Sequence, residues 1–208
     1  MPNPALVGLV SIAPRIADIA GITVFAATGA MAAARKHHDI VAACFFALIT
    51  ATGGGTLRDL LLGVPVFWMV DWSPTFVCIV VGIVVWLMPV RLWPSATMEW
   101  FDGVGLAAYA VYGSAKALAY GTQPLQALAM GVVTATMGGV IRDVVAGERS
   151  MLLRNELYVT AAILASAVFI CLRLLHAPIE ICIAAGFVAG FALRGAAICY
   201  GLKLPQHP

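Results

Sequence analysis

Charged residues are scarce in this chain. Of its 208 residues, 11% are Asp, Glu, Lys or Arg, whereas 62% are hydrophobic. A soluble domain usually carries about 25% charged residues, so the composition argues against one. The net charge of +2, with no basic stripe, also argues against nucleic acid as a partner. These shortages predict a membrane protein with little mass outside the bilayer.

Catalytic and metal-binding motifs are missing as well. The five cysteines lie in separate apolar runs, with no CxxC pair and no cluster with histidine, which argues against a disulfide framework or a metal site. The sequence contains no HExxH, GxSxG or P-loop motif. We therefore expect no enzyme activity, no resident metal and no cofactor. The N-terminus lacks a basic region followed by a small-residue cleavage site, so we also expect no cleavable signal peptide.

Long apolar runs are what the chain has in abundance. A helix that spans a bilayer needs roughly 20 mostly apolar residues. The sequence predicts an all-α membrane protein that forms a single transmembrane domain over residues 1–208. Its seven expected spanning helices cover residues 14–34, 40–62, 74–92, 100–120, 124–146, 156–175 and 179–201.

A motif in the second apolar run recurs 84 residues downstream. Residues 51–59 read ATGGGTLRD, and residues 135–143 read ATMGGVIRD. The two units that share the motif, about 14–92 and 98–175, each hold three expected helices. Because three is odd, the second unit must enter the membrane from the opposite side, which predicts an inverted repeat with the helix at 179–201 outside it. Other residues that match at the same offset are Asp18 with Asp102, Gly29 with Gly113, and Gly63 with Gly147.

Consecutive glycines precede each Arg-Asp pair. Glycine costs a helix interior about 1 kcal/mol relative to alanine, so we expect the second and fifth helices to be broken there. Two broken helices that meet near the midplane can expose carbonyl oxygens to an ion, and threonine hydroxyls are suitable further ligands. Alternatively, the glycines only allow close helix packing. The candidate kink residues are Gly53, Gly54, Gly55, Gly138 and Gly139, and the candidate pore-lining threonines are Thr50, Thr52, Thr134 and Thr136.

The Arg-Asp pairs themselves are candidates for a functional site. A charge inside the bilayer costs about 2.5–3.5 kcal/mol on insertion scales, so such groups normally pair or face water. Arg58, Asp59, Arg142 and Asp143 either line pore vestibules and pair across the pseudo-two-fold axis, or snorkel to the interface. Adjacent helical residues point about 100° apart, so Arg58 need not bond Asp59.

Three more charged residues lie within the expected helices. Asp18 and Asp102 lie near helix starts, where a carboxylate can cap the helix. The alternative is that they pair with the arginines or attract cations. Lys116, whose repeat mate is Ala32, either snorkels outward or lies in the ion pathway as a gate.

The distribution of lysine and arginine predicts the orientation of the chain. If the connection at residues 35–39 is cytoplasmic, eight of the twelve Lys and Arg residues fall on that side of the membrane. Positive residues are enriched in cytoplasmic connections. We therefore expect an inner-membrane protein with its N-terminus outside and its C-terminus in the cytoplasm.

At these motifs the chain resembles the prokaryotic members of the trimeric intracellular cation (TRIC) channel family, some of which carry a glycine transporter or UPF0126 label. The resemblance covers nearly the whole chain. It implies a homotrimer with an hourglass pore in each protomer, kinks at the glycine motifs, and passive conduction of potassium and also sodium. Its partners would be copies of itself, these ions and membrane lipids. The second half departs from a strict triple glycine, because Met137 replaces the first glycine and Val140 follows the pair.

Two other functions stay open at this point. Inverted repeats and broken helices also occur in secondary transporters, so a transporter of a small zwitterion such as glycine is an alternative. A third possibility is a membrane scaffold whose glycines only pack helices.

Overall fold

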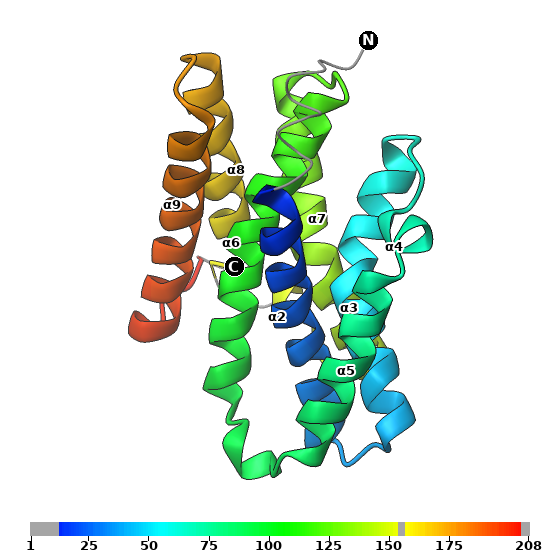
Figure 1. Ribbon diagram of the computed structural model, residues 1–208. Helices are drawn as coiled ribbons and strands as arrows, with labels where there is room; N and C mark the ends of the chain where they lie inside the picture. The colour runs from blue at the N-terminus through cyan, green and yellow to red at the C-terminus, as the bar shows by residue number, and fades with distance from the viewer. Residues whose placement is uncertain (1–12, 154–156, 205–208) are drawn as a thin grey trace.

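The computed structural model describes residues 13–153 and 157–204, and helices make up nearly all of their regular structure (Figure 1). Seven helices have 15 or more residues, and each overlaps one of the seven apolar runs. The elements are α2 (Ala13–Arg35), α3 (Ile40–Leu61), α4 (Phe67–Val70), α5 (Ser73–Leu87), α6 (Ser95–Ala119), α7 (Pro124–Val145), α8 (Val159–Leu174) and α9 (Ile179–Tyr200), with single 3₁₀ turns η1 (Val90–Leu92) and η2 (Met151–Leu153).

The surfaces of these helices suit a lipid environment. Three helices, α3, α7 and α9, are long and apolar enough to cross a membrane, and α5 and α8 are shorter apolar helices. Large apolar side chains such as Val41, Leu125 and Val188 are exposed on their outward faces. Large exposed apolar patches mark surfaces that contact other proteins or a membrane. The chain is an all-helical membrane protein.

Four helices form the centre of the bundle. Helix α2 packs on α3 and α6, and α7 packs on both α6 and α3. Helix α5 covers α2 and α3, while α8 covers α6 and α7. Figure 1 shows α8 and α9 together on one side and α3, α4 and α5 on the other, with α2 and α6 between them. Helix α9 reaches the centre through its contact with α6.

Two helix ends differ from the predicted ranges because of proline. Helix α5 ends at Leu87 rather than at residue 92, since Met88 precedes Pro89 and is extended, with ψ of 144°. A residue before proline disfavours the helical conformation. Helix α6 begins at Ser95 rather than at residue 100, directly after the extended Pro94. The short helix α4 was not predicted.

Helices α3 and α7 end with the same turn. Gly63 and Gly147, which follow these helices, have φ of +66° and +65°, in the left-handed region that favours glycine. The next amides bond back to the helix, with Val64 N–H donating to the Asp59 carbonyl and Glu148 N–H donating to that of Asp143. This glycine-terminated motif reverses the chain beside the last turn of each helix.

The predicted break at the glycines is wrong, because α3 and α7 are helical at every residue. The glycines instead let the two backbones touch. A Cβ built on Gly54 would lie 2.2 Å from the Thr134 carbonyl oxygen, and one on Gly138 would lie 2.2 Å from that of Thr50. Since 54 meets 134 and 50 meets 138, the helices run antiparallel. Close packing of this kind is a known use of small residues in membrane helices.

Candidate functional site

Two buried groups of charged side chains lie near the C-terminal ends of α3 and α7. The Asp59 cluster comprises Asp18, Arg58, Asp59, Tyr109 and Lys116, and the Asp143 cluster comprises Asp102, Arg142, Asp143 and Met151. Because α3 and α7 are antiparallel, the clusters lie toward opposite ends of the bundle. Arg58 lies level with residue 130 of α7, so a rise of 1.5 Å per residue separates the two arginines by roughly 18 Å along the helix axes.

In the Asp59 cluster, two cations share one carboxylate oxygen. Arg58 Nε and Lys116 Nζ each donate to Asp59 Oδ1 at 2.8 Å. The other oxygen, Asp59 Oδ2, accepts the Phe67 backbone N–H at 3.1 Å. Arg58 and Asp59 are 1% and 0% exposed. Charges this deeply buried need partners, and Asp59 has three donors.

The rest of the Arg58 guanidinium lies against aromatic rings. Its Cζ is 5.0 Å from the centre of the Tyr112 ring and 5.9 Å from that of Phe67, which is cation–π geometry. Within the described part of the chain, Arg58 Nη1 has no hydrogen-bond partner. Asp18 is half-buried and accepts the Tyr109 hydroxyl, 3.2 Å from its Oδ1.

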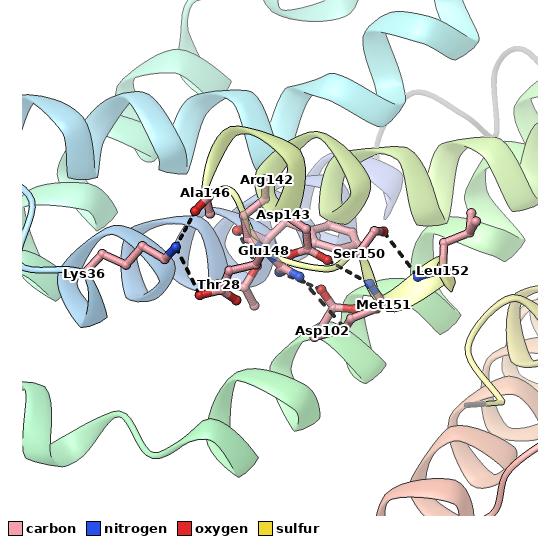
Figure 2. Close-up of polar contacts among 11 residues, drawn as sticks. Thr28, Lys36, Asp102, Arg142, Asp143, Ala146, Glu148, Ser150, Met151 and Leu152 are labelled. Atoms are coloured by element: carbon pink, nitrogen blue, oxygen red, sulfur yellow. Dashed lines mark hydrogen bonds and ion pairs between the residues drawn. The ribbon is translucent and has the colours of Figure 1, made fainter. Parts of the chain in front are cut away.

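In the Asp143 cluster, one cation joins two carboxylates (Figure 2). Arg142 Nε donates to Asp143 Oδ1 at 2.9 Å, and Arg142 Nη1 donates to Asp102 Oδ1 at 2.8 Å. Asp143 Oδ2 accepts the Met151 backbone N–H at 2.9 Å. Arg142 and Asp102 are both 0% exposed. Helices α6 and α7 are therefore tied to each other and to the turn that follows α7.

Equivalent contacts recur in the two clusters at the 84-residue offset. Each arginine bonds the aspartate that follows it, and each aspartate accepts an amide eight residues further on. The neighbouring rings also correspond: a Cβ on Gly21 would lie 2.4 Å from the Tyr109 ring, and one on Gly105 would lie 3.0 Å from the Phe25 ring. The clusters differ where the repeat differs, since Tyr109 matches Phe25, which has no hydroxyl, and Lys116 matches an alanine.

Several expectations for these charges need correction. The sequence left open whether each arginine bonds the adjacent aspartate or a more distant carboxylate. Both arginines bond the adjacent aspartate, and Arg142 also bonds Asp102. The snorkelling alternative is wrong for Arg58, Arg142 and Lys116, since all three are buried and ion-paired. The capping alternative is wrong for Asp18 and Asp102, which lie inside α2 and α6 and not at their first residues.

The four candidate threonines are all buried near the crossing of α3 and α7. Thr50 Oγ1 has no hydrogen-bond partner among the described residues, and a Cβ on Gly29 would lie 2.6 Å from it. Among the four threonine hydroxyls, that of Thr50 is therefore the one without a hydrogen bond to another described residue. The others donate to the carbonyl four residues earlier: Thr52 to Leu48, Thr134 to Met130 and Thr136 to Val132, at 2.6–2.8 Å.

The remaining candidate glycines make room for side chains. A Cβ on Gly53 would lie 2.7 Å from Ile141 Cδ1, and one on Gly55 would lie 2.6 Å from the Phe67 ring. A Cβ on Gly139 would lie 2.9 Å from Tyr158 Oη. Gly55 therefore admits the ring that stacks on Arg58, and Gly139 admits the hydroxyl beside the Asp143 cluster.

A further contact, which the sequence did not indicate, joins two connections at one end of the bundle. Lys36 Nζ donates to the Ala146 carbonyl and lies 3.6 Å from Glu148 Oε1 (Figure 2). The residue that matches Lys36 at the 84-residue offset is Tyr120, so the repeat holds no signal for this contact.

Arg194 was also missed as a buried residue. It belongs to α9, is 1% exposed, and places its Cζ 5.4 Å from the centre of the Tyr158 ring. It contacts the neighbourhood of the Asp143 cluster through Gly103, whose added Cβ would lie 3.1 Å from Arg194 Cγ. An arginine in an otherwise apolar run was the available signal.

The arrangement holds cations and carboxylates, and no metal cage. No group of three or more His, Cys, Asp or Glu side chains could hold a metal ion within residues 13–153 and 157–204. Buried, paired charges inside a membrane bundle are typical of ion or substrate pathways. The two clusters are therefore the candidate site.

Comparison with known proteins places the chain among bacterial membrane proteins. A family model described as glycine transporter matches residues 15–89 and 99–173. The UPF0126 inner membrane protein YadS of Escherichia coli is 39% identical over 193 residues, which cover 90% of this chain and 93% of YadS.

Solved structures give the same picture. The TRIC trimeric intracellular cation channel orthologue from Rhodobacter sphaeroides matches with a TM-score of 0.84 and 40% identity, covering 90% of this chain and 97% of that one. A structure that addresses conductance through TRIC cation channels matches with a TM-score of 0.85 and 27% identity, covering 95% of this chain and 98% of that one.

Proposed function

This chain belongs to the glycine transporter (UPF0126) family, and on that premise we propose that it is a monovalent-cation channel. It conducts potassium and also sodium through one pore in each subunit of a homotrimer in the inner membrane. The name of the Rhodobacter sphaeroides relative, a trimeric intracellular cation channel orthologue, supports both the activity and the trimer. No turnover chemistry is part of the proposal.

One observation carries the proposal: two buried ion-paired clusters lie toward opposite ends of an antiparallel helix crossing. A scaffold that only packs helices has no need of Arg58, Asp59, Arg142 and Asp143 in its interior, where each charge costs free energy. Charges at both ends of a narrow crossing are suited to the vestibules of a pore. In this reading the carboxylates of Asp18 and Asp102 give the two vestibules a negative potential that attracts cations. The positive charge of Lys116 reduces that potential in the vestibule formed by the Asp59 cluster.

The proposed topology is an inverted repeat within one transmembrane domain over residues 1–208. The units at 14–92 and 98–175 each supply three spanning helices, and the helix at 179–201 stands outside them. The contacts that recur at the 84-residue offset support this reading, as does the antiparallel course of α3 and α7. The N-terminus lies outside and the C-terminus in the cytoplasm.

The proposed pore lies among α2, α3, α6 and α7, which form the centre of the bundle. Its narrow part is beside the crossing of α3 and α7, where Gly54 and Gly138 bring the backbones together. The Thr50 hydroxyl, which donates to no carbonyl within the described residues, is available to an ion there. The glycines set the width of this part of the pore by letting the helices approach.

The experiment that tests this function compares ions with glycine. The purified protein is reconstituted into potassium-loaded liposomes, and uptake of radioactive rubidium and of labelled glycine is measured in parallel. We expect rubidium to accumulate and glycine not to. Liposomes without protein give the background, and the Lys36→Met variant serves as a control, because Lys36 lies outside both clusters.

Two results would contradict the channel. Saturable uptake of glycine without rubidium flux would indicate the alternative, a secondary transporter of a small zwitterion. Absence of both fluxes, with the protein inserted and folded, would indicate a scaffold.

A further inference from the structure

The two arginines, which match at the 84-residue offset, differ at one nitrogen. Arg142 Nη1 donates to Asp102 at 2.8 Å, whereas Arg58 Nη1 has no hydrogen-bond partner in the described part of the chain. The carboxylate that corresponds to Asp102 is Asp18. Asp18 is half-buried and interacts electrostatically with Arg58. The Tyr109 hydroxyl lies 3.2 Å from Asp18 Oδ1 and 3.3 Å from the Asp18 backbone carbonyl oxygen.

The two halves of the repeat also differ in the aromatic ring that packs beside each of these carboxylates. Tyr109 of α6 packs over Gly21 of α2, and its hydroxyl reaches Asp18 one turn earlier in α2. The corresponding ring in the other half is Phe25, which packs over Gly105 and has no hydroxyl to offer Asp102. Asp102 pairs with its arginine although the Tyr158 hydroxyl, from the segment before α8, lies beside the Asp143 cluster. Asp18, which accepts a hydroxyl from the facing helix α6, does not pair with Arg58 Nη1.

We propose that Tyr109 is a positioning residue that holds Asp18 away from Arg58, and that the Asp59 cluster has a second state in which Arg58 Nη1 pairs with Asp18. In the observed state, Asp18 ties α2 to α6 through the Tyr109 hydroxyl. In the second state, it ties α2 to α3, just as Asp102 ties α6 to α7. The switch changes which helix the Asp18 carboxylate bonds, at one end of the bundle only.

The observed contacts fit two states of similar stability. A carboxylate–guanidinium pair is stronger than a hydrogen bond from a neutral hydroxyl, which favours the second state. Against this, the Tyr112 and Phe67 rings hold the guanidinium in its present position, 5.0 and 5.9 Å from their centres. We therefore expect that loss of the Tyr109 hydroxyl bond alone shifts the Asp59 cluster from the observed state to the state in which Arg58 pairs with Asp18.

The consequence for conduction rests on the proposed function. If the Asp59 cluster forms one vestibule, movement of α2 from α6 toward α3 opens or closes that end of the pore. The Arg142–Asp102 pair at the other end stays unchanged. Tyr109 then sets the fraction of time the channel is open and not the size of the current through an open pore.

The test is the Tyr109→Phe variant of the full-length protein, with Tyr112→Phe as its matched control. Both remove one hydroxyl from α6, but Asp18 accepts only from Tyr109 among these two. We expect an experimental structure of Tyr109→Phe to have Arg58 Nη1 within hydrogen-bond distance of Asp18. In Tyr112→Phe the Tyr109–Asp18 bond should persist. A Tyr109→Phe structure in which Arg58 Nη1 still has no partner would overturn the proposal.

Single-channel recording supplies the functional readout. We expect Tyr109→Phe to change the open probability at least threefold at unchanged unitary conductance. Adding Asp18→Asn should return the open probability toward that of the wild type, since it removes the new ion pair. A loss that Asp18→Asn does not rescue would contradict the positioning role. If every variant and the wild type are silent, the proposed function fails, while the structural result still decides the role of Tyr109.

Discussion

The Asp59 and Asp143 clusters are built from the same Arg-Asp pair and have different partners. Asp59 is shared by two cations, Arg58 and Lys116, whereas Arg142 is shared by two carboxylates, Asp102 and Asp143. The two clusters also differ at two positions of α6, Tyr109 and Lys116, whose counterparts in α2 are Phe25 and an alanine. One half of the repeat thus carries an extra cation and an extra hydroxyl.

This comparison separates what the repeat shares from what it does not. The shared part comprises the Arg-Asp pair, the amide that caps the aspartate, and the glycine contact between α3 and α7. These contacts hold the bundle together. The unshared part changes the charge and the helix contacts at one end, so the two ends of the proposed pore are not equivalent.

The largest expected effect comes from removal of Arg142. The Arg142→Met variant leaves two buried carboxylates without their cation, which typically costs about 3–5 kcal/mol. In Arg58→Met, Asp59 keeps Lys116, so we expect a smaller loss of about 1.5–3 kcal/mol. Thermal unfolding of both variants in the same detergent measures the difference. Equal losses of unfolding free energy in the two variants would contradict the claim that the two clusters differ in how their charges are paired.

The next effect should be the same in both halves. Gly54→Ala and Gly138→Ala each place a Cβ 2.2 Å from a carbonyl oxygen of the facing helix, so the backbones must separate. We expect each to cost about 1–3 kcal/mol of unfolding free energy. Gly53→Ala is the matched control, because its Cβ would meet only the flexible end of Ile141 at 2.7 Å. A Gly53→Ala loss as large as the other two would argue against backbone contact as the cause.

The Lys116→Met variant removes the extra cation of the Asp59 cluster, which makes this cluster more like the Asp143 cluster. Asp59 keeps Arg58 and the amide of Phe67, so we expect a stability loss of about 1.5 kcal/mol. Removal of a cation from one vestibule should also raise the unitary potassium current. Recording the variant beside the wild type in planar bilayers measures this change. A current that falls or stays constant would place Lys116 away from the ion pathway.

The smallest effect concerns Lys36, which has no counterpart in the other half. Its ion pair with Glu148 is partly exposed, with side chains 33% and 45% accessible. Exposed pairs contribute about 0–1 kcal/mol and are screened by salt. We expect Lys36→Met and Glu148→Gln each to lower the melting temperature by a degree or two at most, less at high salt. A large loss in Lys36→Met alone would assign the stability to its bond with the Ala146 carbonyl.

Much of the fold was predictable because the bilayer fixes helix length. Apolar runs of about 20 residues, bounded by glycine, proline or charge, correspond to seven helices of the structure. The break at the glycines was wrongly predicted because helix propensity counts only the cost of glycine within its own helix. The contact of Gly54 and Gly138 with the facing backbone offsets that cost, and it depends on a neighbour that propensity ignores.

The charged members of the candidate site were also predictable, since charge in an apolar run stands out. Their partners were not. Lys116 lies 57 residues from Asp59, and Arg142 lies 40 residues from Asp102, so pairing depends on how the helices pack. Tyr109, which matches Phe25 in the repeat, was not a site candidate because an aromatic residue in a membrane helix is usually part of the apolar packing. Its only sequence signal is the hydroxyl that its repeat mate lacks.

The most direct test of a cation channel is single-channel recording of the purified protein in planar bilayers under a potassium chloride gradient. We predict discrete current steps that reverse near the potassium equilibrium potential. Steps that reverse near the chloride potential would contradict cation selectivity. A silent bilayer, with the protein inserted and folded, would contradict the channel itself.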